Sequence, residues 1–388
     1  EEEARRQGLL HIIGEEIDRI YIERVKNLAF RKELIRQVGK DLRIVYTPLH
    51  GTGTMPVRRV LKELGFQEVM IVPEQEKPDP DFSTVRSPNP EDPKAFELAL
   101  KLAEEAGADI VVATDPDCDR VGAIVWDKEK NPRLLTGNQT GALLMDYILS
   151  TMQEQKRLPK NGAVVKTIVT SELGAEIAQY YGVDILNTLT GFKFIAEKMK
   201  EFEETGEKQF LFGYEESYGY LAGTFVRDKD AVIATMLICE MAAYYRSKGM
   251  TLYDALMGLY KRHGYYLEDL ESVTLAGKEG MERIQRILES FRREVPEQAG
   301  GKRIALFRDY QSGKGMHLLT GETEHLDLPK SDVLHFTFED HSWFCIRPSG
   351  TEPKIKVYFS VVEKDMEEAK KRLEAVKADV MARIERIP

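Results

Sequence analysis

Cysteines, tryptophans and long hydrophobic runs are scarce in this 388-residue chain. The three cysteines, Cys118, Cys239 and Cys345, are too few for a disulfide framework or a four-thiolate zinc site. The longest apolar run, residues 231–245, includes Glu240 and is too short to cross a bilayer core about 30 Å thick. We therefore expect neither a disulfide-stabilised secreted domain nor a membrane protein.

An excess of positive charge is also absent. Lysine and arginine total 55 against 65 aspartates and glutamates, which gives a formal net charge of −10. Such a chain lacks the basic field that sequence-independent binding to nucleic acid requires. The N-terminus opens with three glutamates and continues with apolar residues at helical spacing, which is not the layout of a signal peptide. The sequence thus predicts a cytoplasmic protein with neither nucleic acid nor membrane as a partner.

The composition, 42% hydrophobic and 31% charged, is typical of a folded protein, and the length predicts two or three domains. Residues 1–40 form a helical lead-in segment. Strand and helix patterns alternate over residues 41–152 and again over 153–263, whereas residues 264–388 show several strands followed by a terminal helix. The predicted fold class is α/β, with two consecutive α/β three-layer domains followed by a smaller α+β C-terminal domain.

The strongest local signal is the acidic loop 114–120, Thr-Asp-Pro-Asp-Cys-Asp-Arg, which directly follows a predicted buried strand. Carboxylates at Asp115, Asp117 and Asp119 alternate along the loop and can converge on a hard divalent cation. An EF-hand is excluded because the sixth position is arginine rather than glycine and the twelfth is tryptophan rather than glutamate. A solvated acidic turn is the alternative interpretation.

A second signal is the turn 345–353, Cys-Ile-Arg-Pro-Ser-Gly-Thr-Glu-Pro, between two apolar strands. Arg347 can direct two donors at a phosphate, while the hydroxyls of Ser349 and Thr351 and the backbone N–H groups around Gly350 can form a small anion-binding nest. The alternative is a hairpin turn rich in proline and glycine whose hydroxyls are incidental.

Weaker signals lie in four other segments. In the segment 212–219, Phe-Gly-Tyr-Glu-Glu-Ser-Tyr-Gly, Glu215 and Ser217 can hydrogen-bond adjacent sugar hydroxyls, although a loop that caps the next helix explains it nearly as well. Lys229 and the turn 190–193 are weaker candidates for a binding site, because charged side chains that simply face solvent explain them as well. The segment 87–90, Ser-Pro-Asn-Pro, is interpreted as proline-rich punctuation between two elements.

Three of these motifs are the acidic loop 114–120, the segment 212–219 and the turn 345–353. Taken together, they resemble those of the phosphoglucomutase/phosphomannomutase (α-D-phosphohexomutase) family, closest to its bacterial phosphoglucomutase branch. The resemblance extends from about residue 41 to near the end of the chain. It implies Mg²⁺ on the three aspartates and contact between Arg120 and the phosphoryl group. It also implies the remaining substrate contacts: sugar hydroxyls on Glu215 and Ser217, sugar phosphate near Thr190, Gly191 and Lys229, and the substrate phosphate on Arg347, Ser349, Gly350 and Thr351.

One part of the family pattern is missing from the sequence. Family members carry a phosphoserine in a first domain, in a Ser-His-Asn-Pro type of loop, and no such loop occurs here. The chain therefore resembles domains two to four, and we expect it to be inactive without an N-terminal phosphoserine domain. The implied activity is interconversion of glucose 1-phosphate and glucose 6-phosphate through a bisphosphate intermediate. The alternatives are a non-catalytic sugar-phosphate-binding module and a Mg²⁺-dependent phosphatase with an aspartate nucleophile.

Overall fold

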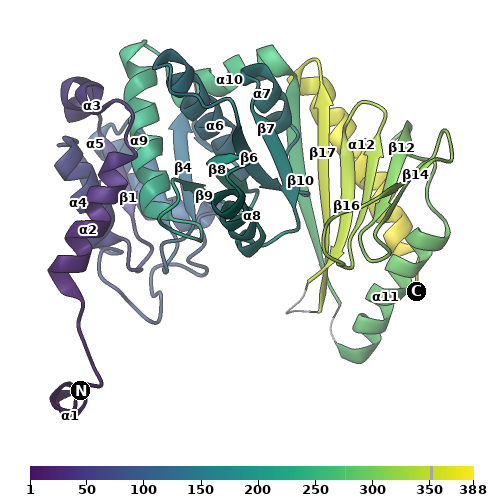
Figure 1. Cartoon of the computed structure of the whole chain (residues 1–388), viewed down its shortest axis with the longest axis horizontal. Coiled ribbons are helices and arrows are strands. Elements are labelled where there is room, and N and C mark those ends of the chain that lie inside the picture. The colour runs from purple at the N-terminus through teal and green to yellow at the C-terminus, as the bar shows by residue number, and fades with distance from the viewer. Residues whose placement is uncertain (276, 350–352) are drawn as a thin grey trace. The chain divides into compact units, whose positions relative to one another are not determined.

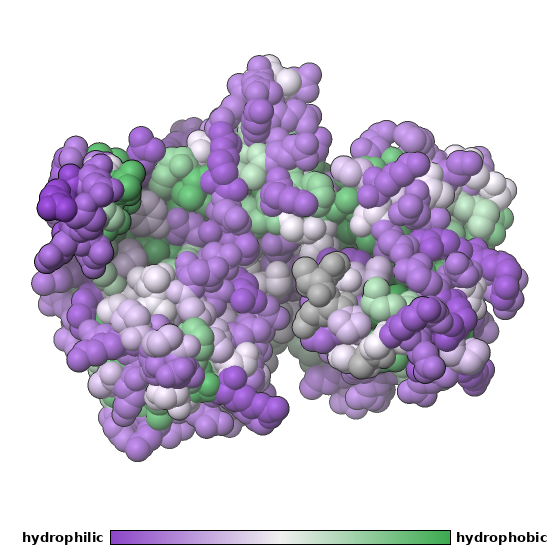
Figure 2. All heavy atoms as spheres, turned by 90° about the horizontal axis from the view of Figure 1, so that it is seen from below, coloured by the Kyte–Doolittle hydropathy of each residue, from purple (hydrophilic) through white to green (hydrophobic). Residues whose placement is uncertain are grey.

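The computed structural model describes residues 1–275, 277–349 and 353–388. The chain divides into two compact units, one of residues 1–163 with 196–256 and the other of residues 164–195 with 257–388 (Figure 1). The face in Figure 2 is mainly hydrophilic, with hydrophobic side chains in smaller groups. None of the helices in the described ranges is both long and apolar enough to span a membrane.

The first unit contains a sheet with the strand order β2-β1-β3-β4-β5. Its strands are β1 (Ile44–Thr47), β2 (Val69–Ile71), β3 (Ile110–Thr114), β4 (Val121–Trp126) and β5 (Pro132–Leu134). The first three pair in parallel, as alternation of strands and helices predicts, and they are mostly buried. The sequence interpretation missed β4 and β5, which pair antiparallel because only a short loop joins β3 to β4.

Helices flank this sheet, as the helical lead-in segment and the alternation of strand and helix patterns predict. The helices up to residue 154 are α1 (Glu2–Arg6), α2 (Gly14–Asn27), α3 (Lys32–Val38), α4 (Thr54–Leu64), α5 (Glu97–Ala106) and α6 (Gly137–Glu154), with short 3₁₀ turns at Gly39–Asp41 and Pro93–Phe96. The lead-in helices are not isolated, because α2 contacts α4 and α3 contacts α9 (Ala231–Ser247). Helix α9, predicted to belong to the second α/β region, contacts β3, β4 and α4 of the first sheet.

A second sheet has the order β7-β6-β8-β9. Its elements and the neighbouring helices are β6 (Gly162–Thr167), α7 (Leu173–Tyr181), β7 (Asp184–Thr188), α8 (Phe192–Thr205), β8 (Gln209–Glu215), β9 (Gly219–Ala222) and α10 (Leu252–His263). Strands β8 and β9 pair antiparallel, with Glu215 opposite Gly219. The segment 212–219 is thus a β-hairpin and not a loop that caps a helix.

The C-terminal sheet, in the second unit, is antiparallel and has the order β10-β17-β16-β15-β12-β13-β14, with β11 beside β12. Its strands are β10 (Tyr265–Thr274), β11 (Gln298–Ala299), β12 (Lys302–Asp309), β13 (Lys314–His317), β14 (Thr323–His325), β15 (Leu334–Phe338), β16 (Trp343–Pro348) and β17 (Lys354–Glu363). Helices α11 (Gly277–Arg293) and α12 (Met366–Glu385) complete the α+β arrangement that the sequence predicts.

Side chains along β16 alternate between the two faces of this sheet, and both faces are buried there. Phe344 and Ile346 point to one side, where they pack in a core with side chains of α11 and α12. Trp343 and Cys345 point to the other side, where they pack with residues such as Leu189. The chain around residue 189 is thereby fixed against the sheet that carries Arg347.

Glu240 is a buried acid on the helix that covers the first sheet. Its side chain accepts a hydrogen bond from the backbone N–H of Arg31, which ties α9 to the start of α3. Burial raises the pKa of Glu240 to about 7, although that backbone hydrogen bond acts in the opposite direction. Because its ordinary value is 4.5, the folded chain keeps a proton between these two pH values that the unfolded chain releases.

We predict that Glu240 makes the free energy of unfolding fall as pH rises from about 4.5 to 7. Between pH 4.5 and pH 8, the free energy of unfolding of E240Q should rise by on the order of 3 kcal/mol relative to that of the wild type, since one pKa unit corresponds to about 1.4 kcal/mol. Urea unfolding monitored by circular dichroism at the two pH values measures this difference. The exposed substitution E204Q is the control, and equal pH dependence in E240Q and wild type would contradict the prediction.

Candidate functional site

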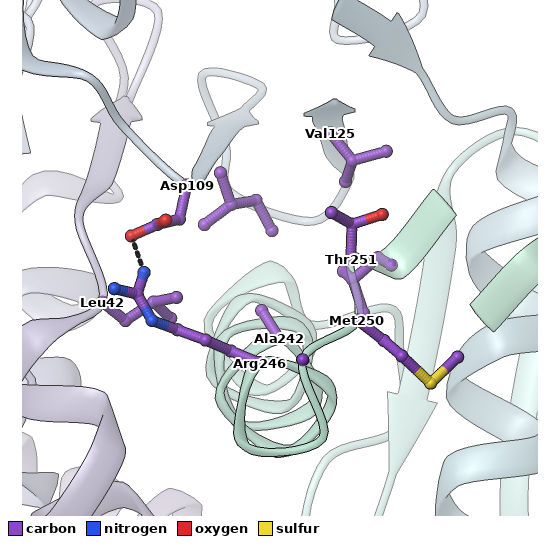
Figure 3. Close-up of a pocket in the computed structure, with 10 residues that line it drawn as sticks. Leu42, Asp109, Val125, Ala242, Arg246, Met250 and Thr251 are labelled. Carbon is purple, nitrogen blue, oxygen red and sulfur yellow. Dashed lines mark ion pairs between the residues drawn. The ribbon is translucent and has the colours of Figure 1, made fainter. Parts of the chain in front are cut away.

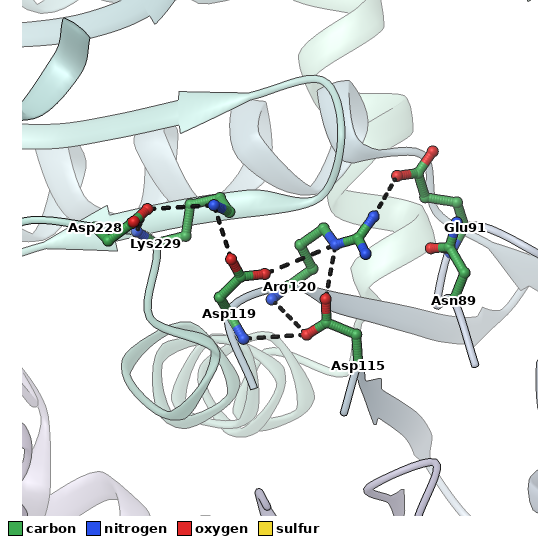
Figure 4. Close-up of polar contacts among 7 residues, drawn as sticks. All are labelled: Asn89, Glu91, Asp115, Asp119, Arg120, Asp228 and Lys229. Atoms are coloured by element: carbon green, nitrogen blue, oxygen red, sulfur yellow. Dashed lines mark hydrogen bonds and ion pairs between the residues drawn. The ribbon is translucent and has the colours of Figure 1, made fainter. Parts of the chain in front are cut away.

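The acidic loop lies at the carboxyl end of β3 and connects it to β4 (Figure 4). Asp115, Asp117 and Asp119 each offer a carboxylate oxygen, and these oxygens all lie within 4.8 Å of one another. Cys118 adopts a left-handed backbone conformation with φ of 60°, which turns the chain sharply inside the loop. The three carboxylates that the sequence singles out are thus brought together.

Asp115 is the buried member of the triplet, with a side chain 1% exposed. Its Oδ1 accepts the backbone N–H groups of Asp119 and Arg120 at 3.0 and 2.9 Å, and its Oδ2 accepts the Nε–H of Arg120 at 2.7 Å. Burial nevertheless raises the pKa of the Asp115 carboxyl to about 6. A divalent cation beside it would offset the cost of this buried charge.

Asp119 gives a second indication that the loop fits a cation. Its Oδ1 is buried and accepts no hydrogen bond from the residues that the structure describes, although Nε of Arg120 lies 3.7 Å away. Its Oδ2 lies 2.8 Å from Nζ of Lys229. An all-oxygen donor set with one such carboxylate oxygen suits a hard cation such as Mg²⁺ or Ca²⁺ and does not suit a thiolate-preferring metal.

Arg120 lies between the loop and a segment far from it in sequence. Its Nε donates to Asp115, and its Nη1 donates to Glu91 at 3.2 Å. Its Nη2 donates to no residue within the described part of the chain. This edge of the guanidinium is therefore available to an anion.

The Glu-x-Ser hairpin adjoins the acidic loop in the same compact unit. Arg120 and Gly219 form an isolated antiparallel bridge, and the backbone N–H of Val121 donates to the carbonyl of Tyr218 at 3.1 Å. A Cβ at Gly219 would lie 2.2 Å from Cδ of Lys229, so a larger residue here would displace the lysine side chain. Glu215 is buried at the end of β8, and Ser217 lies in the turn. Two of the three predicted motifs and Lys229 are thus neighbours.

The third motif belongs to a cavity of about 380 Å³ in the second unit. Thr190, from the turn before α8, and Lys193, in the first turn of α8, line it together with Lys330, Arg347 and Ser349. Gly191 has φ of 119°, a conformation that favours glycine, and lies between the first two of these residues. Gly350 and Thr351, which the sequence also assigns to phosphate binding, lie outside the described residues.

Positive charge dominates this cavity. Lys193, Lys330 and Arg347 form no ion pair with any carboxylate in the described ranges, whereas the lining carboxylate Asp332 is paired with Arg292. Three unneutralised cations beside serine and threonine hydroxyls suit a phosphate monoester. The sequence interpretation did not find Lys330, because it follows a proline in a loop and belongs to no motif.

Another cavity, of about 200 Å³, lies at the opposite end of β3 from the acidic loop (Figure 3). Its walls are largely apolar, with side chains such as Leu42, Val125 and Met250. Its two charged residues, Asp109 and Arg246, pair with each other. A cavity whose charges are already satisfied has no group to hold a phosphate, so we do not assign the site here.

Comparisons with known proteins agree with these observations. The families described as Phosphoglucomutase/phosphomannomutase, alpha/beta/alpha domain II, alpha/beta/alpha domain III and C-terminal domain match residues 19–128, 136–263 and 280–380. A phosphoglucomutase of Staphylococcus aureus (strain MRSA252) is 40% identical over 352 residues, which are 89% of this chain and 62% of that protein. The chain thus spans about three-fifths of the length of such relatives.

Two solved structures have the same fold. The first is Paramecium parafusin (phosphoglucomutase), with a TM-score of 0.65 at 17% identity, covering 94% of this chain and 61% of the other. The second is Aspergillus fumigatus N-acetylphosphoglucosamine mutase in complex with GlcNAc-6P and magnesium, with a TM-score of 0.55 at 15% identity, covering 97% and 68%. The matches follow one another in the order of the family's domains. The chain therefore belongs to the phosphoglucomutase/phosphomannomutase family and contains its domains II and III and its C-terminal domain.

Proposed function

We propose that this chain provides the metal-, sugar- and phosphate-binding parts of a phosphohexomutase that interconverts glucose 1-phosphate and glucose 6-phosphate. The observation that carries the proposal is the acidic triplet beside Arg120, whose Nη2 makes no hydrogen bond to a described residue. Phosphoryl transfer needs positive charge on the oxygens of the moving group, and this loop supplies positions for it. The 40% identity to the S. aureus phosphoglucomutase supports glucose phosphates as substrates.

Asp115, Asp117 and Asp119 are the proposed ligands of a divalent cation, Mg²⁺ by preference. The donor set suits this ion, and the Aspergillus fumigatus mutase was solved in complex with magnesium. When bound, the ion would supply charge to the phosphoryl oxygens. Arg120 adds a second cation through its Nη2. Lys229, paired with Asp119, holds that carboxylate in place.

The substrate contacts are assigned by chemistry. Glu215 and Ser217 of the hairpin are proposed to bind sugar hydroxyls. Arg347 and Ser349, with Lys193 and Lys330 in the same cavity, are proposed to bind the phosphate that does not react, and Thr190 and Gly191 to hold the sugar phosphate near them. Gly350 and Thr351 stay predictions from the family resemblance.

A phosphoserine must come from outside this sequence, because no Ser-His-Asn-Pro loop occurs in it. We propose that a phosphoserine-bearing domain is the partner of this chain, that the chain alone is inactive, and that both act in the cytoplasm. A phosphatase with an aspartate nucleophile would instead form a phosphoaspartate, and trapping that adduct would favour the phosphatase.

We predict that the purified chain with Mg²⁺ converts no glucose 1-phosphate, because it has no phosphoryl donor. Addition of a separately produced and phosphorylated domain I of the S. aureus phosphoglucomutase should start turnover, measured with a glucose 6-phosphate dehydrogenase assay. A non-catalytic module would stay inactive after the addition. Turnover by the chain alone, in the absence of that domain, would contradict the assignment.

For the metal, we predict that D117N weakens Mg²⁺ binding by about tenfold or more, because one of three charged ligands is lost. Asp117 is exposed, so the substitution should not unfold the loop. Isothermal titration calorimetry of the chain measures the affinity, and D81N, which neutralises an exposed aspartate outside the triplet, is the matched control. Equal affinities in D117N and D81N would count against the site.

In the second unit, R347Q should weaken binding of glucose 6-phosphate by about tenfold to a hundredfold, since a charge-assisted hydrogen bond contributes roughly 1.5–3 kcal/mol. R303Q removes an exposed arginine from β12 of the same sheet and should leave the affinity unchanged. Both affinities can be measured by calorimetry on the chain. If R303Q weakened binding as much as R347Q, general electrostatic attraction would explain the data and the assignment of Arg347 would be wrong.

A further inference from the structure

Glu91 lies in a loop that the sequence interpretation treated only as proline-rich punctuation. Its backbone N–H donates to Oδ1 of Asn89 at 3.0 Å, and the N–H of Asp92 donates to the carbonyl of Asn89 at 3.0 Å. Pro88 and Pro90 on either side of Asn89 have restricted φ angles. The loop therefore presents Glu91 from a backbone with little freedom.

Close packing fixes this loop against the strand that follows the acidic loop. A Cβ at Gly122 of β4 would lie 2.7 Å from the carbonyl oxygen of Pro90, so the two backbones approach as closely as glycine permits. Gly122 is two residues beyond Arg120. The carboxylate of Glu91 thus has a defined position relative to the Arg120 side chain.

The guanidinium of Arg120 is held at two of its three nitrogens (Figure 4). Asp115 binds Nε at 2.7 Å, and Glu91 binds Nη1 at 3.2 Å. Asp119 is the other carboxylate close to it, at 3.7 Å from Nε. Asp115 alone would leave the planar group able to swing about the Nε contact, whereas a second carboxylate at Nη1 fixes the plane.

The pair formed by Glu91 and Arg120 has little value for stability. The two side chains are 33% and 31% exposed, and ion pairs of this kind contribute at most about 1 kcal/mol. The contact instead orients the guanidinium of Arg120, because it leaves Nη2 as the nitrogen that can bind an anion.

We propose that Glu91 is a positioning residue, which holds the guanidinium of Arg120 so that Nη2 faces the phosphoryl group of the substrate. This inference rests on the proposed function, because it needs a phosphorylated ligand at the acidic loop. Glu91 itself contacts no substrate and acts only through Arg120.

The test is a double-mutant cycle on the affinity for glucose 1,6-bisphosphate, measured by calorimetry on the chain in saturating Mg²⁺. E91A should weaken binding about tenfold, and E91Q, which keeps an acceptor for Nη1, should recover part of the loss. In the R120A background, E91A should have no further effect. Thermal unfolding checks that each variant is folded.

Glu76 provides the matched control, because its side chain is 34% exposed and pairs with Arg58 at 3.0 Å. E76A should leave the affinity unchanged. Equal binding by wild type and E91A, or an equal loss from E91A with and without Arg120, would overturn the role of Glu91 while the proposed function stood. A wild-type chain that does not bind the bisphosphate would contradict the proposed function, and the inference would fall with it.

Discussion

The candidate site in the first unit depends on the burial of one carboxylate. Asp115 directly follows β3 and is shielded from solvent, and it organises the loop by accepting two backbone N–H groups and the Nε–H of Arg120. This arrangement orients the neighbouring carboxylates and the arginine at once. The same burial makes the charge of Asp115 costly, which is why a cation beside it is favoured on physical grounds.

Support for this loop comes from chain segments distant in sequence. The backbone N–H of Ala231, at the start of α9, donates to the carbonyl of Cys118 at 3.1 Å. Asp230 caps the same helix through the N–H of Ile233 and accepts the hydroxyl of Tyr21 from α2. The lead-in segment and helix α9, which the sequence assigned to the second α/β region, therefore both hold the acidic loop in position.

Local patterns allowed candidate site residues to be proposed from the sequence. The acidic triplet lies within a few residues between two strands, so spacing alone brought its carboxylates together. Glu91 and Lys330 could not be found in this way, because their partners lie far away in the chain. Strand β10 was also missed, since an edge strand in which charged residues such as Glu268 and Glu271 interrupt the apolar ones lacks a continuous apolar pattern.

Helix α9 shows the same limit for the fold. The sequence assigned it to the second α/β region, whereas the tertiary structure shows that it covers β3 and β4 of the first sheet. The domain boundaries at residues 152 and 263 stay predictions from the sequence. The periodicity of apolar residues predicts whether a segment is a helix or a strand. The sheet on which that segment packs depends on contacts between residues distant in sequence.

A crystal structure of the chain with Mn²⁺ and glucose 1,6-bisphosphate tests the central claim most directly. Anomalous scattering locates the metal independently of any assumption about its ligands. Our account predicts one strong anomalous peak among the carboxylates of Asp115, Asp117 and Asp119, with a phosphoryl oxygen within hydrogen-bond distance of Arg120 Nη2. A metal bound elsewhere, or a phosphoryl group that does not approach Arg120, would contradict it.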